Sequence, residues 1–165
     1  MSGRILLDSN TVMYLFNSVI PLESFKQAFN GAEQMVSIIT ELELLSFPRL
    51  SEEQETDIRR FLTKRAIIPL TDKIKEKTIE FRRRTNRKLP DSIIAATSIV
   101  CEAVLITGDK DLLKLSFPGL RTVSAPGGLI AHEKGRGPPP PQAPQAPSVM
   151  SGKGSAALTL FRVRF

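Results

Sequence analysis

The sequence predicts a single α/β domain built on a mostly parallel sheet. Short apolar segments of strand character alternate along the chain with helical segments, as they do in strand–helix–strand units. Two of the apolar runs stop at an aspartate, in Ile5-Leu6-Leu7-Asp8 and Leu105-Ile106-Thr107-Gly108-Asp109. The 165 residues, 41% of them hydrophobic, suffice for one domain with a real core but not comfortably for two.

The first half of the chain shows two strand–helix units. The apolar run at 4–7 predicts a strand, and the polar residues after it provide an Asx-type start for a helix. A second brief apolar run precedes a buried helix that Pro48 ends. The expected elements are strands at 4–7 and 35–38 and helices at 11–16, 22–29 and 39–45.

Capping signals mark helix starts in the second half of the chain. Ser51-Glu52-Glu53-Gln54 has the spacing of a capping box, and Thr71 begins an amphipathic helix with Ile74, Thr78 and Phe81 on one stripe. Pro90 is placed as at a helix start, before the Ala95-Ala96 pair that permits close packing. The expected elements are helices at 51–65 and 92–101, a helix that begins at 71, and strands at 66–70, 103–106 and 120–123.

The character of the chain changes after Glu133. Residues 135–155 contain six prolines besides Gly and Ser, a composition that cannot form a packed core. We therefore expect a domain at 1–130 and a Pro/Gly-rich, disordered tail at 131–165. His132, the sole histidine, lies at this boundary and is interpreted as an exposed linker residue.

Composition predicts a cytoplasmic protein with no membrane segment. The single Cys101 excludes an internal disulfide, and Asp8 interrupts the only early apolar run. The longest apolar stretch, at 92–106, contains Glu102 and is too short to span a bilayer.

The net charge of +6 is unevenly distributed. Residues 133–165 contribute +4 of it, whereas residues 59–88 hold 12 basic and 3 acidic side chains. Such a basic stripe is typical either of a phosphate-binding surface or of solvated helix faces.

Four segments place a carboxylate at a strand end or a helix start, and they predict a metal-dependent phosphodiesterase site. Ligands of parallel sheets bind beyond the carboxyl ends of the strands, and gathered carboxylates repel one another unless they share a proton or hold a cation. Several oxygen ligands together suit Mg²⁺ or Mn²⁺. The four segments are Ile5-Leu6-Leu7-Asp8, Ile39-Thr40-Glu41-Leu42-Glu43, Leu89-Pro90-Asp91 and Leu105-Ile106-Thr107-Gly108-Asp109.

Each acid also has a structural interpretation. Asp8 could cap the helix that follows it, and Asp91 could complement the dipole of its own helix. Glu41 and Glu43 lie two apart, so helical geometry lets only one of them share a face with Thr40. Of Asp109 and Asp111, one could cap while the other binds metal.

These four segments, in this order and spacing, resemble the PIN domain and most closely toxin ribonucleases of the VapC type, over residues 1–125. The resemblance implies a three-layer α/β/α fold, Mg²⁺ or Mn²⁺ as cofactor, RNA as substrate, a homodimer and a small antitoxin partner. It selects Glu43 over Glu41 and Asp109 over Asp111. The implied catalytic and metal-binding residues are Asp8, Glu43, Asp91 and Asp109, with Ser9, Asn10, Thr40, Thr107 and Asp111 in supporting roles.

With no suitably embedded His or Cys, the expected nucleophile is a metal-activated water. Basic residues would hold the RNA backbone without reading sequence, and the candidates are Arg82, Arg83, Arg84, Arg87 and Lys88. Tyr14 and the phenylalanines are more often core residues than stacking platforms, and none of them is assigned to RNA binding. An antitoxin could place a cation among the acids and lay a helix on apolar residues expected to be exposed, namely Val12, Phe16, Phe25 and Phe29.

Two other functions fit parts of the pattern. Asp8-Ser9-Asn10-Thr11-Val12 resembles the nucleophile motif of haloacid-dehalogenase-type phosphatases, although Asn10 stands where that motif has its second aspartate. A catalytically silent interaction module could use the basic stripe alone, but the presence of all four acids disfavours it.

Overall fold

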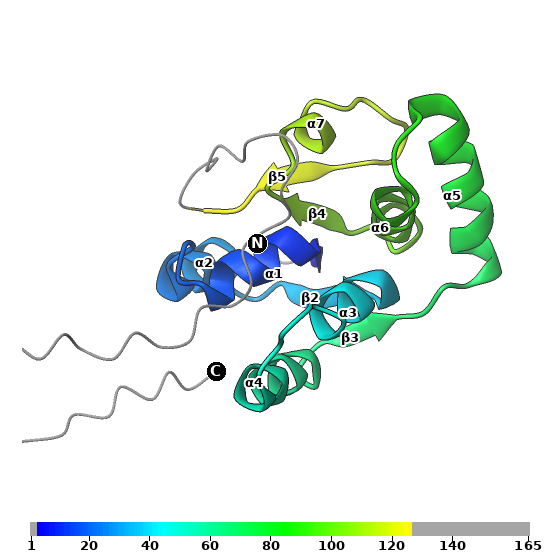
Figure 1. Ribbon diagram of the computed structural model, residues 1–165. Helices are drawn as coiled ribbons and strands as arrows, with labels where there is room; N and C mark the ends of the chain where they lie inside the picture. The colour runs from blue at the N-terminus through cyan, green and yellow to red at the C-terminus, as the bar shows by residue number, and fades with distance from the viewer. Residues whose placement is uncertain (1–2, 127–165) are drawn as a thin grey trace, which may run out of the picture.

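A five-stranded parallel sheet forms the centre of the molecule. The computed structural model describes residues 3–126, and within them the strand order is β3-β2-β1-β4-β5 with every pairing parallel (Figure 1). This confirms the predicted α/β fold class. The strands are β1 (Arg4–Leu7), β2 (Glu33–Ser37), β3 (Ala66–Ile68), β4 (Val104–Thr107) and β5 (Thr122–Ser124).

Helices connect the strands and cover both faces of the sheet. They are α1 (Ser9–Phe16), α2 (Leu22–Ala28), α3 (Ile38–Leu45), α4 (Glu52–Leu62), α5 (Asp72–Thr85), α6 (Leu89–Val100) and α7 (Lys110–Leu113). Because side chains alternate along a strand, Ile5 and Leu7 of β1 pack with α1, α2 and α4, whereas Leu6 packs with α5, α6 and α7. The result is a three-layer α/β/α arrangement.

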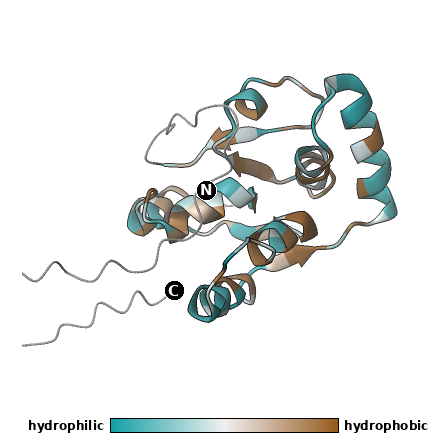
Figure 2. Ribbon diagram, viewed as in Figure 1, coloured by the Kyte–Doolittle hydropathy of each residue, from teal (hydrophilic) through white to brown (hydrophobic). Residues whose placement is uncertain are grey.

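The hydropathy of each element follows this layering. Figure 2 shows hydrophobic residues along the strands and α6, while α5 is mostly hydrophilic with hydrophobic patches. The buried residues of α5 are Ile74, Thr78 and Phe81, the stripe that the sequence predicts. Helix α6 is buried along most of its length because α5 covers it from outside.

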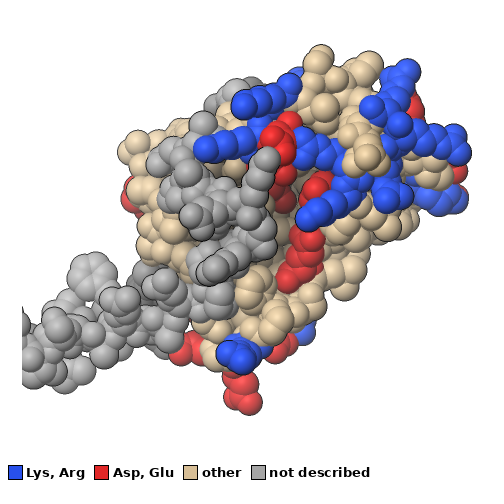
Figure 3. Space-filling model, turned by 45° about the horizontal axis from the view of Figure 1, so that its top comes forward, with Lys and Arg blue, Asp and Glu red and all other residues tan. Residues whose placement is uncertain are grey.

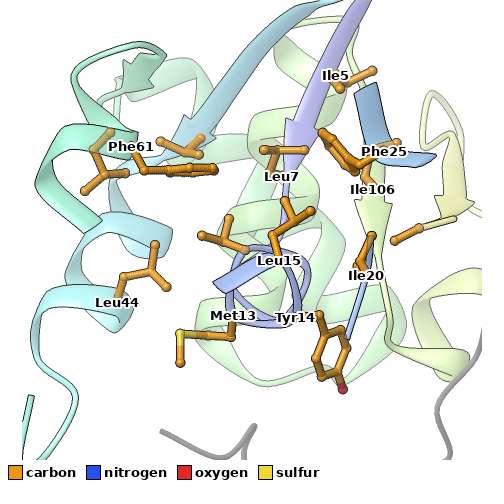
Figure 4. Close-up of a cluster of buried hydrophobic side chains, with 14 of the residues drawn as sticks. Ile5, Leu7, Met13, Tyr14, Leu15, Ile20, Phe25, Leu44, Phe61 and Ile106 are labelled. Atoms are coloured by element: carbon orange, nitrogen blue, oxygen red, sulfur yellow. The ribbon is translucent and has the colours of Figure 1, made fainter. Parts of the chain in front are cut away.

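The core cluster on the α1 side corrects one expectation. Val12, Phe25 and Phe29 are fully or nearly fully buried, and the rings of Phe25 and Phe29 pack at a tilt with centroids 4.9 Å apart. Only Phe16 of that group is half-buried. Figure 4 shows Phe25 within this cluster, beside Ile5, Leu7 and Ile106. The expectation of an exposed apolar surface at 12–29 was wrong, because these short helices lie directly on the sheet rather than on its rim.

The caps expected at Ser51 and Thr71 are present. The Asx-type start expected before α1 is not, because the carboxyl group of Asp8 makes no capping hydrogen bond. Ser51 and Gln54 form a complete capping box, with the Ser51 hydroxyl accepting from the Gln54 N–H at 3.2 Å and the Gln54 carbonyl accepting from the Ser51 N–H at 2.9 Å. Two helices begin earlier than predicted: α1 at Ser9 and α6 at Leu89. Both start immediately after an extended residue, so the chain turns into helix without a loop.

The expected domain boundary near 130, the tail at 131–165 and His132 lie outside the residues that the structure describes. Within residues 3–126, no helix has the length and apolar character needed to cross a bilayer.

Candidate active site

The strand order brings the predicted acidic segments to one edge of the sheet. The central strand β1 lies between β2 and β4, so the carboxyl ends of these three strands are neighbours. Asp8 follows β1, α3 with Glu43 follows β2, and Asp109 follows β4. Asp91 is added from the first turn of α6, the helix that leads into β4. This is the edge at which open parallel sheets bind ligands.

Asp8 is a buried carboxyl group that does not cap its helix. It occupies the position before α1, with extended backbone, yet its side chain makes no capping hydrogen bond. Instead its Oδ2 accepts a hydrogen bond of 2.7 Å from the Thr107 hydroxyl. Burial raises the pKa of Asp8 to about 7; Thr107 opposes this rise, and the charges of Glu43 and Asp91 add to it.

Glu43 is joined to the segment that carries Asp8. The Ser9 hydroxyl donates a short hydrogen bond to Oε2 of Glu43, and the Thr40 hydroxyl lies 3.4 Å from the Leu7 carbonyl oxygen. Thr40 and Glu43 therefore lie on the α3 face that meets the end of β1. No hydrogen bond or ion pair links Glu41 to the other acids within residues 3–126, as the helical register requires.

Asp91 is the third residue of α6, where a carboxylate complements the helix dipole. The charged groups around Asp91 indicate a role beyond stabilising its helix. Partial burial raises the pKa of Asp91 and the charge of Asp109 adds to the rise, while Lys88 and Arg87 lower it. Asp91 is thus within electrostatic reach of both Asp8 and Asp109.

Asp109 performs a capping role and faces the other acids at the same time. Its Oδ1 accepts hydrogen bonds from the N–H groups of Asp111 and Leu112, at 2.7 and 3.2 Å, at the start of α7. Its own N–H donates to the Thr107 hydroxyl at 3.0 Å. Because that hydroxyl also donates to Asp8, Thr107 links the two carboxyl groups. Asp111 is exposed and its N–H, rather than its carboxylate, supports Asp109.

Two further residues contribute to the site without having been singled out. The buried Thr11 hydroxyl donates to the Ile106 carbonyl at 2.9 Å and ties α1 to β4. Tyr14, which is in the core as predicted, also contacts the site. Burial and the charge of Asp8 raise its pKa, and its ring leaves only 3.0 Å for a Cβ at Gly108. Neither contact has a signal in sequence spacing. Asn10, expected to support the acids, has no hydrogen bond to them within residues 3–126.

The donor set fits a hydrated divalent cation better than a closed metal cage. Among residues 3–126, no three acidic, His or Cys side chains are grouped tightly enough to form a ready-made cluster. The charges of Glu43 and Asp91 nevertheless help to raise the pKa of Asp8, and the charge of Asp109 helps to raise that of Asp91. Mg²⁺ keeps several waters and needs only one or two direct carboxylates, so these four acids are compatible with it.

Basic side chains border the acidic group. Figure 3 shows acidic residues gathered on one face of the molecule, with Lys and Arg side chains beside them. Arg84 is paired with Glu80 at 3.3 Å, and the Nε of Arg82 donates to the Arg87 carbonyl at 3.2 Å. Arg87 reaches the acids themselves, with its Nη1 3.9 Å from Asp109 and 3.6 Å from Asp111.

Comparison with known proteins agrees with this architecture. A chain in a toxin–antitoxin complex from Klebsiella pneumoniae is 30% identical, with a TM-score of 0.59 over 72% of this chain and 95% of that one. A chain of VapBC2 from Rickettsia felis, bound to a promoter DNA fragment, is 20% identical, with a TM-score of 0.64 over 73% and 98%. A chain of DNA-bound VapBC from Salmonella typhimurium is 17% identical, with a TM-score of 0.63 over 73% of this chain and 97% of that one.

No curated protein matches the chain. The PIN domain family, however, matches residues 5–118, a span that runs from β1 past α7 and includes all four candidate acids. The chain therefore belongs to the PIN domain family.

Proposed function

We propose that this protein is a Mg²⁺- or Mn²⁺-dependent endoribonuclease and the toxin of a toxin–antitoxin pair. One observation carries the catalytic part of the proposal. Asp8 is buried at the end of the central strand, does not cap its helix, and has a pKa raised to about 7 by burial and by two other carboxylates. Such a carboxyl group is costly for the fold, and perturbed acids of this kind concentrate at functional sites.

In this proposal Asp8, Glu43, Asp91 and Asp109 would hold the divalent ion, which would supply an activated water and positive charge for the scissile phosphate. The chain's own residues prepare that site. Thr107 holds Asp8 and Asp109 through one hydroxyl, and Ser9 holds Glu43. Asp8 releases its proton when positive charge is bound beside it, because the cation offsets the repulsion from Glu43 and Asp91.

The RNA backbone would lie along the basic residues beside the site. Arg82, Arg83 and Arg84 form the last turn of α5, and Lys88 precedes α6. Contacts of this kind bind phosphate without reading bases, so they weaken as salt rises. A cytoplasmic location, where RNA is available, is part of the proposal, as is a homodimer.

A phosphatase of the haloacid-dehalogenase type is less compatible with the site. That mechanism needs Asp8 as an ionised nucleophile and an acid two residues later, where this chain has Asn10. A silent binding module would have no need to bury Asp8 beside other carboxylates. The PIN domain membership also favours the nuclease.

A matched pair of glutamate variants tests the catalytic proposal. Glu43→Gln should lose most Mn²⁺-dependent RNA cleavage, whereas Glu41→Gln, two residues away on the same helix, should retain it. The reason is that only Glu43 is bonded to Ser9 and lies near Asp8. Cleavage of a mixed RNA substrate is measured with Mn²⁺ and with EDTA. Metal-independent cleavage, or a larger loss in Glu41→Gln, would contradict the assignment.

The toxin proposal rests on the complexes in which similar chains are found. The similar chains from Klebsiella pneumoniae and Rickettsia felis come from toxin–antitoxin and VapBC complexes, so a small antitoxin is the partner proposed here. Val12, Phe25 and Phe29 are buried in the core, so these three side chains are not part of the proposed antitoxin-binding surface.

Expression of the chain should therefore arrest bacterial growth, and the Glu43→Gln variant should not, because growth arrest would follow from RNA cleavage. Colony counts after induction measure the effect. Equal protein levels of the two variants, checked by immunoblot, provide the control. A wild-type chain that cleaves RNA in vitro but leaves growth unchanged would indicate an RNA-processing enzyme instead.

A further inference from the structure

Arg87 connects the basic surface to the acidic site. It lies between α5 and α6, one residue after Asn86, which closes α5 in the left-handed conformation with φ of 52°. Its side chain is only 22% exposed, compared with 58% for Arg84. The Nη1 atom lies 3.9 Å from Oδ2 of Asp109 and 3.6 Å from Oδ2 of Asp111. The guanidinium is therefore directed into the site rather than into solvent.

The backbone around Arg87 is held from both neighbouring helices. Its carbonyl oxygen accepts a hydrogen bond of 3.2 Å from Nε of Arg82 in α5 and lies 3.5 Å from the Ser92 hydroxyl in α6. The same hydroxyl donates to the Lys88 carbonyl at 2.8 Å. These contacts fix the connection, so that the Arg87 side chain starts from a defined position beside the acids.

Two carboxyl groups form ion pairs with this one cation, and a third lies nearby. Besides Asp109 and Asp111, Asp91 is close enough for the charge of Arg87 to lower its pKa. The Oδ2 atom of Asp109 is the oxygen left over from capping α7, and it is therefore the one available to a metal ion. Arg87 faces that same oxygen.

We propose that Arg87 is an internal counter-cation of the site: it neutralises Asp109 and Asp111 until a divalent ion binds, and it then turns from Asp109 to the RNA phosphate. This inference rests on the proposed nuclease function and deepens it. The two ion pairs are long and partly exposed, and pairs of that kind are weak enough to be displaced. A guanidinium released beside the site is suited to phosphate, which it binds through two parallel hydrogen bonds.

Binding of Mn²⁺ alone to the full chain tests the inference. Arg87→Gln should bind Mn²⁺ about five-fold more tightly than wild type at low salt, because one repelling and competing charge is removed. Arg87→Lys keeps the charge and should stay within about two-fold of wild type. Titration calorimetry measures both, and the difference should shrink at high salt.

Lys73→Gln provides the matched control. Lys73 is exposed, takes part in no ion pair within residues 3–126, and lies at the other end of α5, about 20 Å away at 1.5 Å per residue. Lys73→Gln lowers the net charge by the same amount as Arg87→Gln, and it should leave the Mn²⁺ affinity unchanged.

The outcomes separate this inference from the proposed function. At saturating Mn²⁺, Arg87→Gln should cleave RNA less efficiently than wild type even though it binds the metal more tightly. Unchanged or weaker Mn²⁺ binding by Arg87→Gln, in a wild-type background that binds Mn²⁺ and cleaves RNA, overturns the counter-cation alone. Equally tight binding by Arg87→Lys and Arg87→Gln overturns it as well. A wild-type chain that neither binds Mn²⁺ nor cleaves RNA overturns the nuclease proposal together with it.

Discussion

Replacing Asp8 with asparagine is expected to lower metal-dependent RNA cleavage at least about 100-fold. Removing a residue that merely supports a metal ligand costs about 10–100-fold, so a direct ligand at the centre of the site should cost at least as much. Asparagine keeps the shape of Asp8 and an oxygen that can accept from Thr107, so the fold should be preserved. The measurement is initial cleavage rate at saturating Mn²⁺.

Two further variants are compared with Asp8→Asn. Asp91→Asn should cause a comparable loss, because Asp91 is within electrostatic reach of both Asp8 and Asp109. Asp57→Asn, which changes a carboxylate of α4 that forms an ion pair with Arg60, should retain full activity. Full activity of both Asp8→Asn and Asp91→Asn would refute the site assignment.

The second expected result is that Asp8→Asn stabilises the metal-free protein at pH 8. In the folded protein the pKa of Asp8 is about 7, against 3.8 for an exposed aspartate. Between these values the folded protein holds a proton that the unfolded chain has released. The free energy of unfolding therefore falls as pH rises from about 4 to about 7, by up to roughly 4 kcal/mol at 1.36 kcal/mol per pKa unit. Asparagine has no such titration.

Urea unfolding in EDTA at pH 4 and pH 8 measures this effect. The gain of Asp8→Asn over wild type should be several kcal/mol larger at pH 8 than at pH 4. Asp72→Asn, which alters a carboxylate that is 94% exposed, should follow the wild-type profile. Adding Mn²⁺ at pH 8 should raise the stability of wild type but not of Asp8→Asn, because the metal binds the ionised carboxylate. Identical pH profiles of wild type and Asp8→Asn would show that Asp8 is not perturbed.

Together, these two expected results mean that a residue required for activity lowers the stability of the metal-free protein. The same carboxyl group that the proposal needs for metal binding destabilises the metal-free fold at neutral pH. Such a trade between stability and activity is common at active sites. It also implies that metal content will affect the apparent stability of any preparation of this protein.

Local signals in the sequence determined most of the elements. Ser51 and Gln54 predict a capping box, Thr71 predicts the start of α5, and both are present because caps depend on neighbours within one turn. The alternation of apolar runs predicts the parallel sheet. Helical periodicity also predicts that Thr40 and Glu43 share one face, and both contact the segment at the end of β1. The choice of Glu43 over Glu41 as a metal ligand remains a prediction.

Contacts between distant segments were decided only by the tertiary structure. Val12, Phe25 and Phe29 were expected to be exposed, and only packing on the sheet determines that they are buried. Asp8 looks like a helix cap until Thr107, 99 residues away, is seen to hold its carboxyl group. Arg87 belongs to a basic run in the sequence, yet the fold directs it to Asp109 and Asp111. The burial of a side chain and the charges around it depend on which distant segments pack together, and the spacing of residues in the sequence does not determine that.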